Sequence, residues 1–204
     1  MPQQRRLIII PIVHTRADFG SLGSKVPADQ QYETMATQYW RAGSEYVQKL
    51  PGDFSKLKVY QDGLPNVPPE LVTYVIDRAK PVNYDILRWL RKQGADIIGT
   101  EDPELLGKEY NLYQATLITH STEEEYVDAR LNYNRMKPIL CKMRSEYIAQ
   151  RIKATLPEDG MGILLISLAH EVKRLLEQEI EVSEPETLDL AGYLPFKTIA
   201  IFSR

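Results

Sequence analysis

Four short runs of consecutive apolar residues are the clearest pattern in the chain. They cover residues 7–13, 57–61, 95–99 and 162–167. Each run is apolar at successive positions rather than at every second position, which is typical of central strands covered on both faces. The pattern therefore predicts four buried strands.

The segments between these runs have the spacing and the boundary residues of helices. Helices are predicted over residues 30–50, 69–79 and 82–93, where Pro51, Pro81 and Gly94 mark boundaries. From residue 121 onward the chain predicts one long helix or two consecutive helices. In that segment Ser121 and Thr122 are placed as caps, and Pro138 as a kink or a break.

Strands and helices alternate along the chain, which favours an α/β fold. We expect residues 1–204 to form a single-domain layered sandwich with a mainly parallel central sheet flanked by helices. The residue pattern of the tail, residues 196–204, predicts one further strand. A length of 204 residues with 43% hydrophobic content is enough for one sizeable core.

The composition limits which binding partners and which cellular location we expect for the chain. The net charge is −3 and the basic residues are interspersed with acidic ones. The sequence therefore shows no basic face, and we expect no nucleic-acid partner. The apolar run near the start is too short to span a bilayer, and no cleavage site follows it, so we expect no membrane partner and a cytoplasmic location. Cys141 is the single cysteine, which excludes an internal disulfide and a cysteine metal cluster and favours a packed thiol. The oligomeric state is not predicted.

Histidines and carboxylates follow the predicted strands. The four strands lead, in chain order, to His14, Asp62, Glu101 and His170. Small ligands of open α/β sheets bind at the carboxyl ends of the strands, so these side chains predict a site for Zn²⁺, Mn²⁺, Fe²⁺ or Co²⁺. Each also has a structural alternative: helix capping or a backbone hydrogen bond for the histidines, turn chemistry for Asp62, and helix N-terminal charge for Glu101. Residues 20–24, "GSLGS", predict a flexible loop at the rim.

Short motifs in the same places resemble a known superfamily. "PIVH" and "SLAH" at two strand ends, "VYQDG" after the second strand and "MRSEYIAQRI" on a late helix are similar to the TraB/Tiki, ChaN and erythromycin-esterase-like superfamily. The resemblance implies paired histidines at His14 and His170, an acidic residue at Asp62 and a helical arginine at Arg144, with Glu146 as a possible added acid. Pro11 and Ser167 stand where that superfamily usually has glycine.

Together these observations predict a metal-dependent hydrolase acting on a small-molecule or peptide substrate. A divalent ion held by the two histidines and by Asp62 or Glu101 would activate a water molecule. Arg144 would bind a substrate anion or the developing oxyanion, and Glu146 or Glu171 would carry the proton. Two alternatives stay open: a metal-free esterase in which His14 is the base, oriented by Asp62, and a protein that binds haem or a phosphate-bearing metabolite without catalysis.

Overall fold

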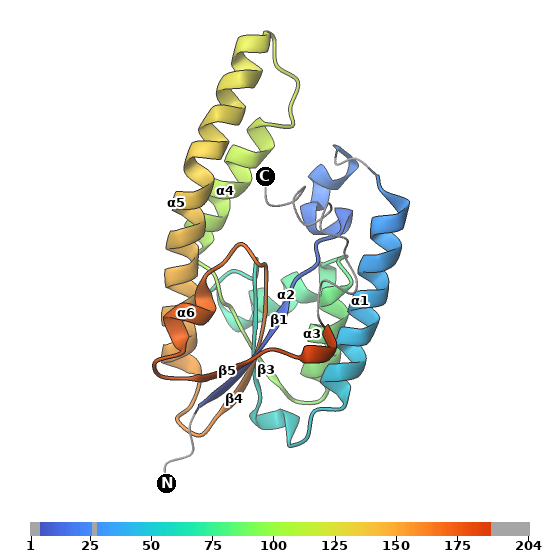
Figure 1. The fold of residues 1–204 in the computed structure, drawn as a ribbon, viewed down its shortest axis with the longest axis vertical. Helices are drawn as coiled ribbons and strands as arrows, with labels where there is room; N and C mark the ends of the chain where they lie inside the picture. Colours follow the sequence, from blue (N-terminus) through green and yellow to red (C-terminus); the bar gives the residue numbers. More distant parts are fainter. Residues whose placement is uncertain (1–4, 26–27, 189–204) are drawn as a thin grey trace.

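A five-stranded parallel sheet forms the centre of the computed structural model, which describes residues 5–25 and 28–188 (Figure 1). Its spatial order is β3-β2-β4-β1-β5. The strands are β1 (Arg6–Pro11), β2 (Lys58–Gln61), β3 (Asp96–Ile98), β4 (Met161–Ile166) and β5 (Glu181–Ser183). The α/β prediction and all four predicted strands are confirmed, whereas the strand expected at residues 196–204 lies outside the described residues.

Helices cover both faces of the sheet, as the continuously apolar strands require. Alternate residues of β1 point to opposite faces. Ile8 and Ile10 join one buried cluster with α1 (Gln30–Gln48), α2 (Pro69–Arg78) and α3 (Asn83–Lys92). Leu7 and Ile9 join the other, with α5 (Glu123–Thr155) and α6 (Val172–Leu176).

The long helix α5 and its partner α4 (Pro103–Ala115) form a hairpin that projects beyond the carboxyl ends of the strands (Figure 1). The Thr122 side chain accepts a hydrogen bond from the Glu125 amide, and the Glu125 side chain accepts one from the Ser121 amide, so the predicted cap is present. α5 is 33 residues long and includes Pro138, so of the two predicted alternatives the segment forms one long helix, without a break at the proline. None of the helices in the described ranges combines the length and apolar character needed to cross a membrane.

Candidate active site

The order of the strands brings three predicted site segments to one edge of the sheet. β4 lies between β1 and β2 and pairs with both in parallel. The segments that follow these strands carry His14, Asp62 and His170, and therefore start from adjacent positions. The expectation that the strands leading to His14 and His170 are neighbours is confirmed.

Helix α1 fixes the backbone that leads from β1 to His14. Three aromatic side chains of α1 donate hydrogen bonds to carbonyls of this segment: Tyr39 to Pro11 at 2.6 Å, Trp40 to Val13 at 2.9 Å and Tyr32 to His14 at 2.6 Å. Pro11 is the last residue of β1, and Val13 and His14 lie beyond it, so these donors pair carbonyls at the point where the sheet ends.

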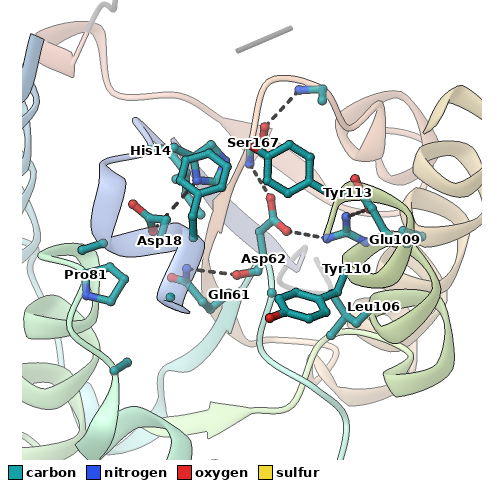
Figure 2. Close-up of a pocket in the computed structure, with 18 of the residues that line it drawn as sticks. His14, Asp18, Gln61, Asp62, Pro81, Leu106, Glu109, Tyr110, Tyr113 and Ser167 are labelled. Atoms are coloured by element: carbon teal, nitrogen blue, oxygen red, sulfur yellow. Dashed lines mark hydrogen bonds and ion pairs between the residues drawn. The ribbon is translucent and has the colours of Figure 1, made fainter. Parts of the chain in front are cut away.

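A cavity of about 800 Å³ opens above this edge of the sheet (Figure 2). Its floor includes Asp62, Arg144 and His170. One wall comes from the 3₁₀ segment η1 (Arg16–Lys25) and the connection between α2 and α3, and the opposite wall from α4 and α5. Its volume lies within the usual range for small-molecule sites.

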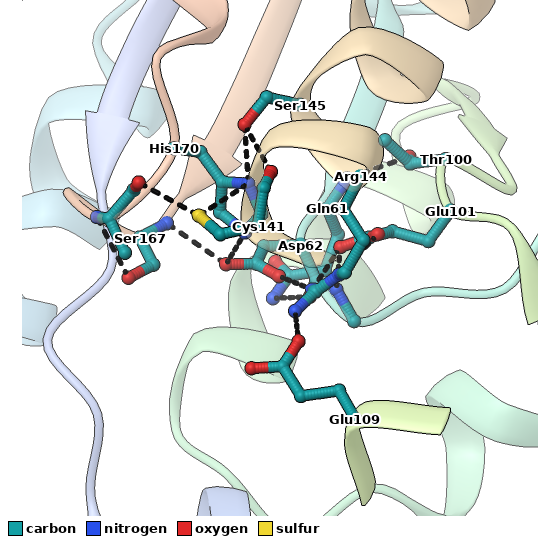
Figure 3. Close-up of polar contacts among 12 residues, drawn as sticks. Gln61, Asp62, Thr100, Glu101, Glu109, Cys141, Arg144, Ser145, Ser167 and His170 are labelled. Atoms are coloured by element: carbon teal, nitrogen blue, oxygen red, sulfur yellow. Dashed lines mark hydrogen bonds and ion pairs between the residues drawn. The ribbon is translucent and has the colours of Figure 1, made fainter. Parts of the chain in front are cut away.

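Arg144 of α5 is the hub of the polar contacts on this floor (Figure 3). Its Nε donates to Glu101 Oε2 at 2.8 Å and its Nη2 to Asp62 Oδ1 at 2.7 Å. Nη2 also contacts Glu101 Oε1, and Nη1 contacts Glu109 of α4. Arg144 is 8% exposed and Glu101 is fully buried. One guanidinium therefore faces three carboxylates.

Glu101 and Asp62, two of the carboxylates that Arg144 contacts, differ in their protonation. Burial raises the pKa of Glu101 to about 7, an effect that its hydrogen bonds with Arg144 oppose. Burial would also raise the pKa of Asp62, but the positive charges of the His170 ring in its protonated form and of Arg144 outweigh it and hold that pKa below its ordinary value; when the ring is neutral, the Arg144 charge still acts on Asp62. Asp62 is thus the ionised member of the pair.

Backbone hydrogen bonds position Asp62 and Glu101. The Asp62 amide donates to Leu165 O at 2.8 Å, and Asp62 Oδ2 accepts from the Ser167 amide at 3.1 Å. Glu101 Oε1 accepts from the Gly63 amide, also at 3.1 Å. Gly63 has a φ of +77°, a conformation that glycine adopts at little cost. The turn after β2 therefore connects both carboxylates to β4.

The hydrogen bonds around His170 assign its tautomer. The Ser145 hydroxyl donates to the Cys141 carbonyl at 2.7 Å, and the Cys141 thiol donates to the Ala169 carbonyl at 2.9 Å. Ser145 Oγ, 3.0 Å from His170 Nδ1, has therefore used its hydrogen, so Nδ1 must be the donor. Burial lowers the pKa of His170 and favours the neutral ring. Nε2 then carries a free lone pair.

That lone pair faces Asp62. His170 Nε2 lies 3.7 Å from Asp62 Oδ2, and the His170 side chain is only 3% exposed. Asp62, Glu101 and His170 each offer a ligand atom, and these atoms lie within 4.8 Å of one another. The spacing suits one cation with ligands at about 2.1 Å. Glu101 can contribute only by releasing an oxygen that Arg144 now holds.

The structure does not bring all the predicted residues into this cluster. His14 lines the cavity, but its Nδ1 lies 3.9 Å from Asp18 Oδ1. Burial would lower the pKa of His14, yet the hydrogen bond and charge of Asp18 raise it. Glu146 is half-exposed beside Lys142 and, like Glu171, lines a separate groove against α6. Neither acid reaches the cavity.

Other features were missed by sequence reasoning. Glu109 and Ser145 contact Arg144 and His170 respectively; Glu109 lies in a helix outside the quoted motifs, and Ser145 lies inside "MRSEYIAQRI" but was given no role. Residues 20–24 belong to the 3₁₀ segment η1 rather than to a loop. A Cβ atom at Gly23 would lie 2.3 Å from Arg16 O, so this glycine permits a close backbone contact.

Comparison of the chain with protein-family models, curated proteins and solved structures found no match. The resemblance to the TraB/Tiki, ChaN and erythromycin-esterase-like superfamily therefore stays a prediction.

Proposed function

We propose that this chain is a metal-dependent hydrolase of a small-molecule or peptide substrate. The observation that carries the proposal is the convergence of the His170 Nε2 lone pair and the ionised Asp62 carboxylate, 3.7 Å apart on the floor of a ligand-sized cavity. Two lone pairs this close repel each other unless an electrophile or a hydrogen-bond donor lies between them. The strand-end motifs that resemble the superfamily named above agree with this proposal.

Asp62, His170 and, after exchange with Arg144, Glu101 would hold the ion, which we expect to be Zn²⁺, Mn²⁺, Fe²⁺ or Co²⁺. Such an ion supplies Lewis acidity, which lowers the pKa of a water and polarises the scissile carbonyl or phosphoryl oxygen. Ser145 keeps the His170 ring in the orientation that directs Nε2 to the site.

Arg144 has the geometry to stabilise negative charge in the cavity. Its Nη1 donates to Glu109 alone among the described residues, and an NH₂ group has a second hydrogen to offer. This N–H is available to an oxyanion that develops when the scissile carbonyl or phosphoryl group is attacked. Glu109 then keeps the guanidinium oriented.

A metal-free hydrolase is the second candidate, and Arg144 supports it. Both Glu101 oxygens already accept hydrogen bonds from this guanidinium. Glu101, the third candidate ligand of the cation, is therefore engaged by Arg144. Here His170 Nε2 would take the proton of an attacking water, and Asp62 would stabilise the imidazolium that forms. His170 suits this role better than His14, because Asp18 favours the protonated form of His14.

Metal titration combined with hydrolysis assays tests both candidates. Chelator-treated protein is titrated with ZnCl₂ and MnCl₂ by calorimetry, and hydrolysis of 4-nitrophenyl acetate and bis(4-nitrophenyl) phosphate is followed with and without metal. We expect one ion per chain and metal-stimulated hydrolysis, both lost in Asp62→Asn and His170→Ala. Glu146→Gln, on the same helix as Arg144 but outside the cavity, is the control and should retain both.

The other outcomes separate the candidates. Hydrolysis that persists in chelator and disappears in His170→Ala supports the metal-free enzyme. Metal binding without hydrolysis of either ester, or loss of both properties in the Glu146→Gln control, contradicts the proposed hydrolase site.

A further inference from the structure

The charged groups around the cavity differ in whether they already have a partner. Asp18 accepts hydrogen bonds from the amide and the hydroxyl of Thr15, and Glu109 is paired with Arg144. The acidic groups at the walls of the cavity are therefore engaged inside the protein.

The basic groups at the same cavity are not engaged in this way. Arg78 at the end of α2, Lys80 in the connection to α3, and Lys137 of α5 all line it. None of the three forms an ion pair with a carboxylate of the described residues. Arg78 lies over the Tyr74 ring at 4.6 Å, and Lys137 lies over the Tyr133 ring at 5.9 Å. The cavity therefore has positive charge to offer and no unpaired acid to oppose it.

A row of aromatic rings from η1, α4 and α5 borders the same cavity. Phe19 of η1 and Tyr113 of α4 have ring centroids 5.6 Å apart, and Tyr113 lies 5.6 Å from Tyr133 of α5. All three rings border the cavity and are only partly buried. Figure 2 shows Tyr113 and Tyr110 turned toward the same space as Asp62. Burial raises the pKa of both Tyr113 and Tyr133, so their phenol groups are neutral at ordinary pH.

This combination defines a ligand class. Offset or edge-on packing against a row of rings favours a planar aromatic group. Unpaired lysine and arginine side chains favour a carboxylate or a phosphate. A cationic ligand has no free carboxylate to bind at these walls, and a purely aliphatic one would not use the rings.

We propose that the cavity binds a planar aromatic group that carries an anionic substituent, with the ring against Phe19, Tyr113 and Tyr133 and the anion at Lys80 and Lys137. Under the proposed function, on which this last step rests, the substrate is an ester or amide whose aromatic group carries a separate anionic substituent. Its scissile bond then lies over Asp62 and His170, because the rings and the catalytic pair border one cavity.

Calorimetric binding to chelator-treated protein tests the proposal without requiring hydrolysis. The probes are 2-naphthoate, the cationic analogue 2-naphthylmethylamine and the aliphatic anion cyclohexanecarboxylate. We expect saturable binding of 2-naphthoate, with each analogue about fivefold weaker or more. Added NaCl should weaken 2-naphthoate binding, because salt screens the attraction between its carboxylate and the lysines of the cavity.

Two matched double variants test where the anion binds. Lys80→Gln/Lys137→Gln should weaken 2-naphthoate binding about fivefold or more and leave the preference for the ring. Lys108→Gln/Lys142→Gln removes the same charge from α4 and α5 outside this cavity and should have no effect. Tyr113→Leu should reduce the preference for 2-naphthoate over cyclohexanecarboxylate.

Three results would overturn the proposal: no saturable binding of 2-naphthoate, equal affinity for the cationic analogue, or equal losses in the two double variants. Absence of metal binding or of hydrolysis, with naphthoate binding intact, would refute the proposed function and leave this ligand class standing.

Discussion

Arg144 holds Glu101 by both carboxylate oxygens, with Nε 2.8 Å from Oε2 and Nη2 against Oε1. Glu101 is fully buried and Arg144 nearly so. A buried pair of this kind recovers the cost of removing its charges from water only while both partners are present. The pair therefore determines both the stability of the site and its access to a metal ion.

Replacing Arg144 should destabilise the protein strongly. Arg144→Met leaves Asp62, Glu101 and Glu109 without their common cation, and we expect a loss of about 3–5 kcal/mol in the free energy of unfolding at pH 7. Urea denaturation measures it. The double variant Arg144→Met/Glu101→Gln should recover part of the loss, because one uncompensated carboxylate has been removed. A loss below about 1 kcal/mol in the single variant would show that the contacts contribute little to stability.

Removing the His170 imidazole should affect the apo protein and its response to metal. Its Nδ1–H bonds Ser145 in a buried setting, so His170→Ala should cost about 1–3 kcal/mol in chelator. In the parent, metal should raise Tm with concentration, following RT ln(1 + [L]/Kd), and this rise should vanish in the variant. Thermal melts of both proteins with and without ZnCl₂ measure both effects. A metal-insensitive parent would contradict the metal site.

His14 should make the free energy of unfolding depend on pH at values above 6.5, the ordinary pKa of histidine. Its folded-state pKa is raised above 6.5 through Asp18, so its contribution is fully present below pH 6.5 and is lost as pH rises through the folded pKa. The difference in unfolding free energy between the parent and His14→Gln should therefore be largest at low pH and decline above pH 6.5. Urea titrations across this range measure it. A difference that grows with pH would indicate a lowered pKa instead.

Two glycine substitutions should act in opposite directions. Gly23→Ala places a Cβ 2.3 Å from Arg16 O and should destabilise the protein by about 1–3 kcal/mol, because the backbone of η1 must move. Gly107 lies inside α4 with open space around it, so Gly107→Ala should stabilise by about 0.5–1 kcal/mol. Melting curves of the two variants provide matched measurements, and equal effects would contradict the close contact at Gly23.

The strand ends could be predicted from the sequence because the apolar runs identify the strands directly. β5 was missed because three residues, "EVS", carry no periodic signal. Glu146 follows Arg144 by two residues, which is roughly 200° around a helix, so the inward position of Arg144 turns Glu146 outward. The contacts of Glu109 and Ser145 depend on how α4 and α5 pack against the sheet. Such packing of distant segments has no local signature.

The place of β4 in the sheet has a consequence for folding during synthesis. β4 is the central strand, yet it follows β2 by roughly 100 residues, and β1 and β2 pair with β4 rather than with each other. At about 5–20 residues per second the ribosome needs roughly 5–20 s to make that interval. Two apolar segments therefore emerge long before the strand that joins them. Since β4 also leads directly to His170, the joining of β1 and β2 in one sheet and the assembly of the candidate active site both have to wait for this interval.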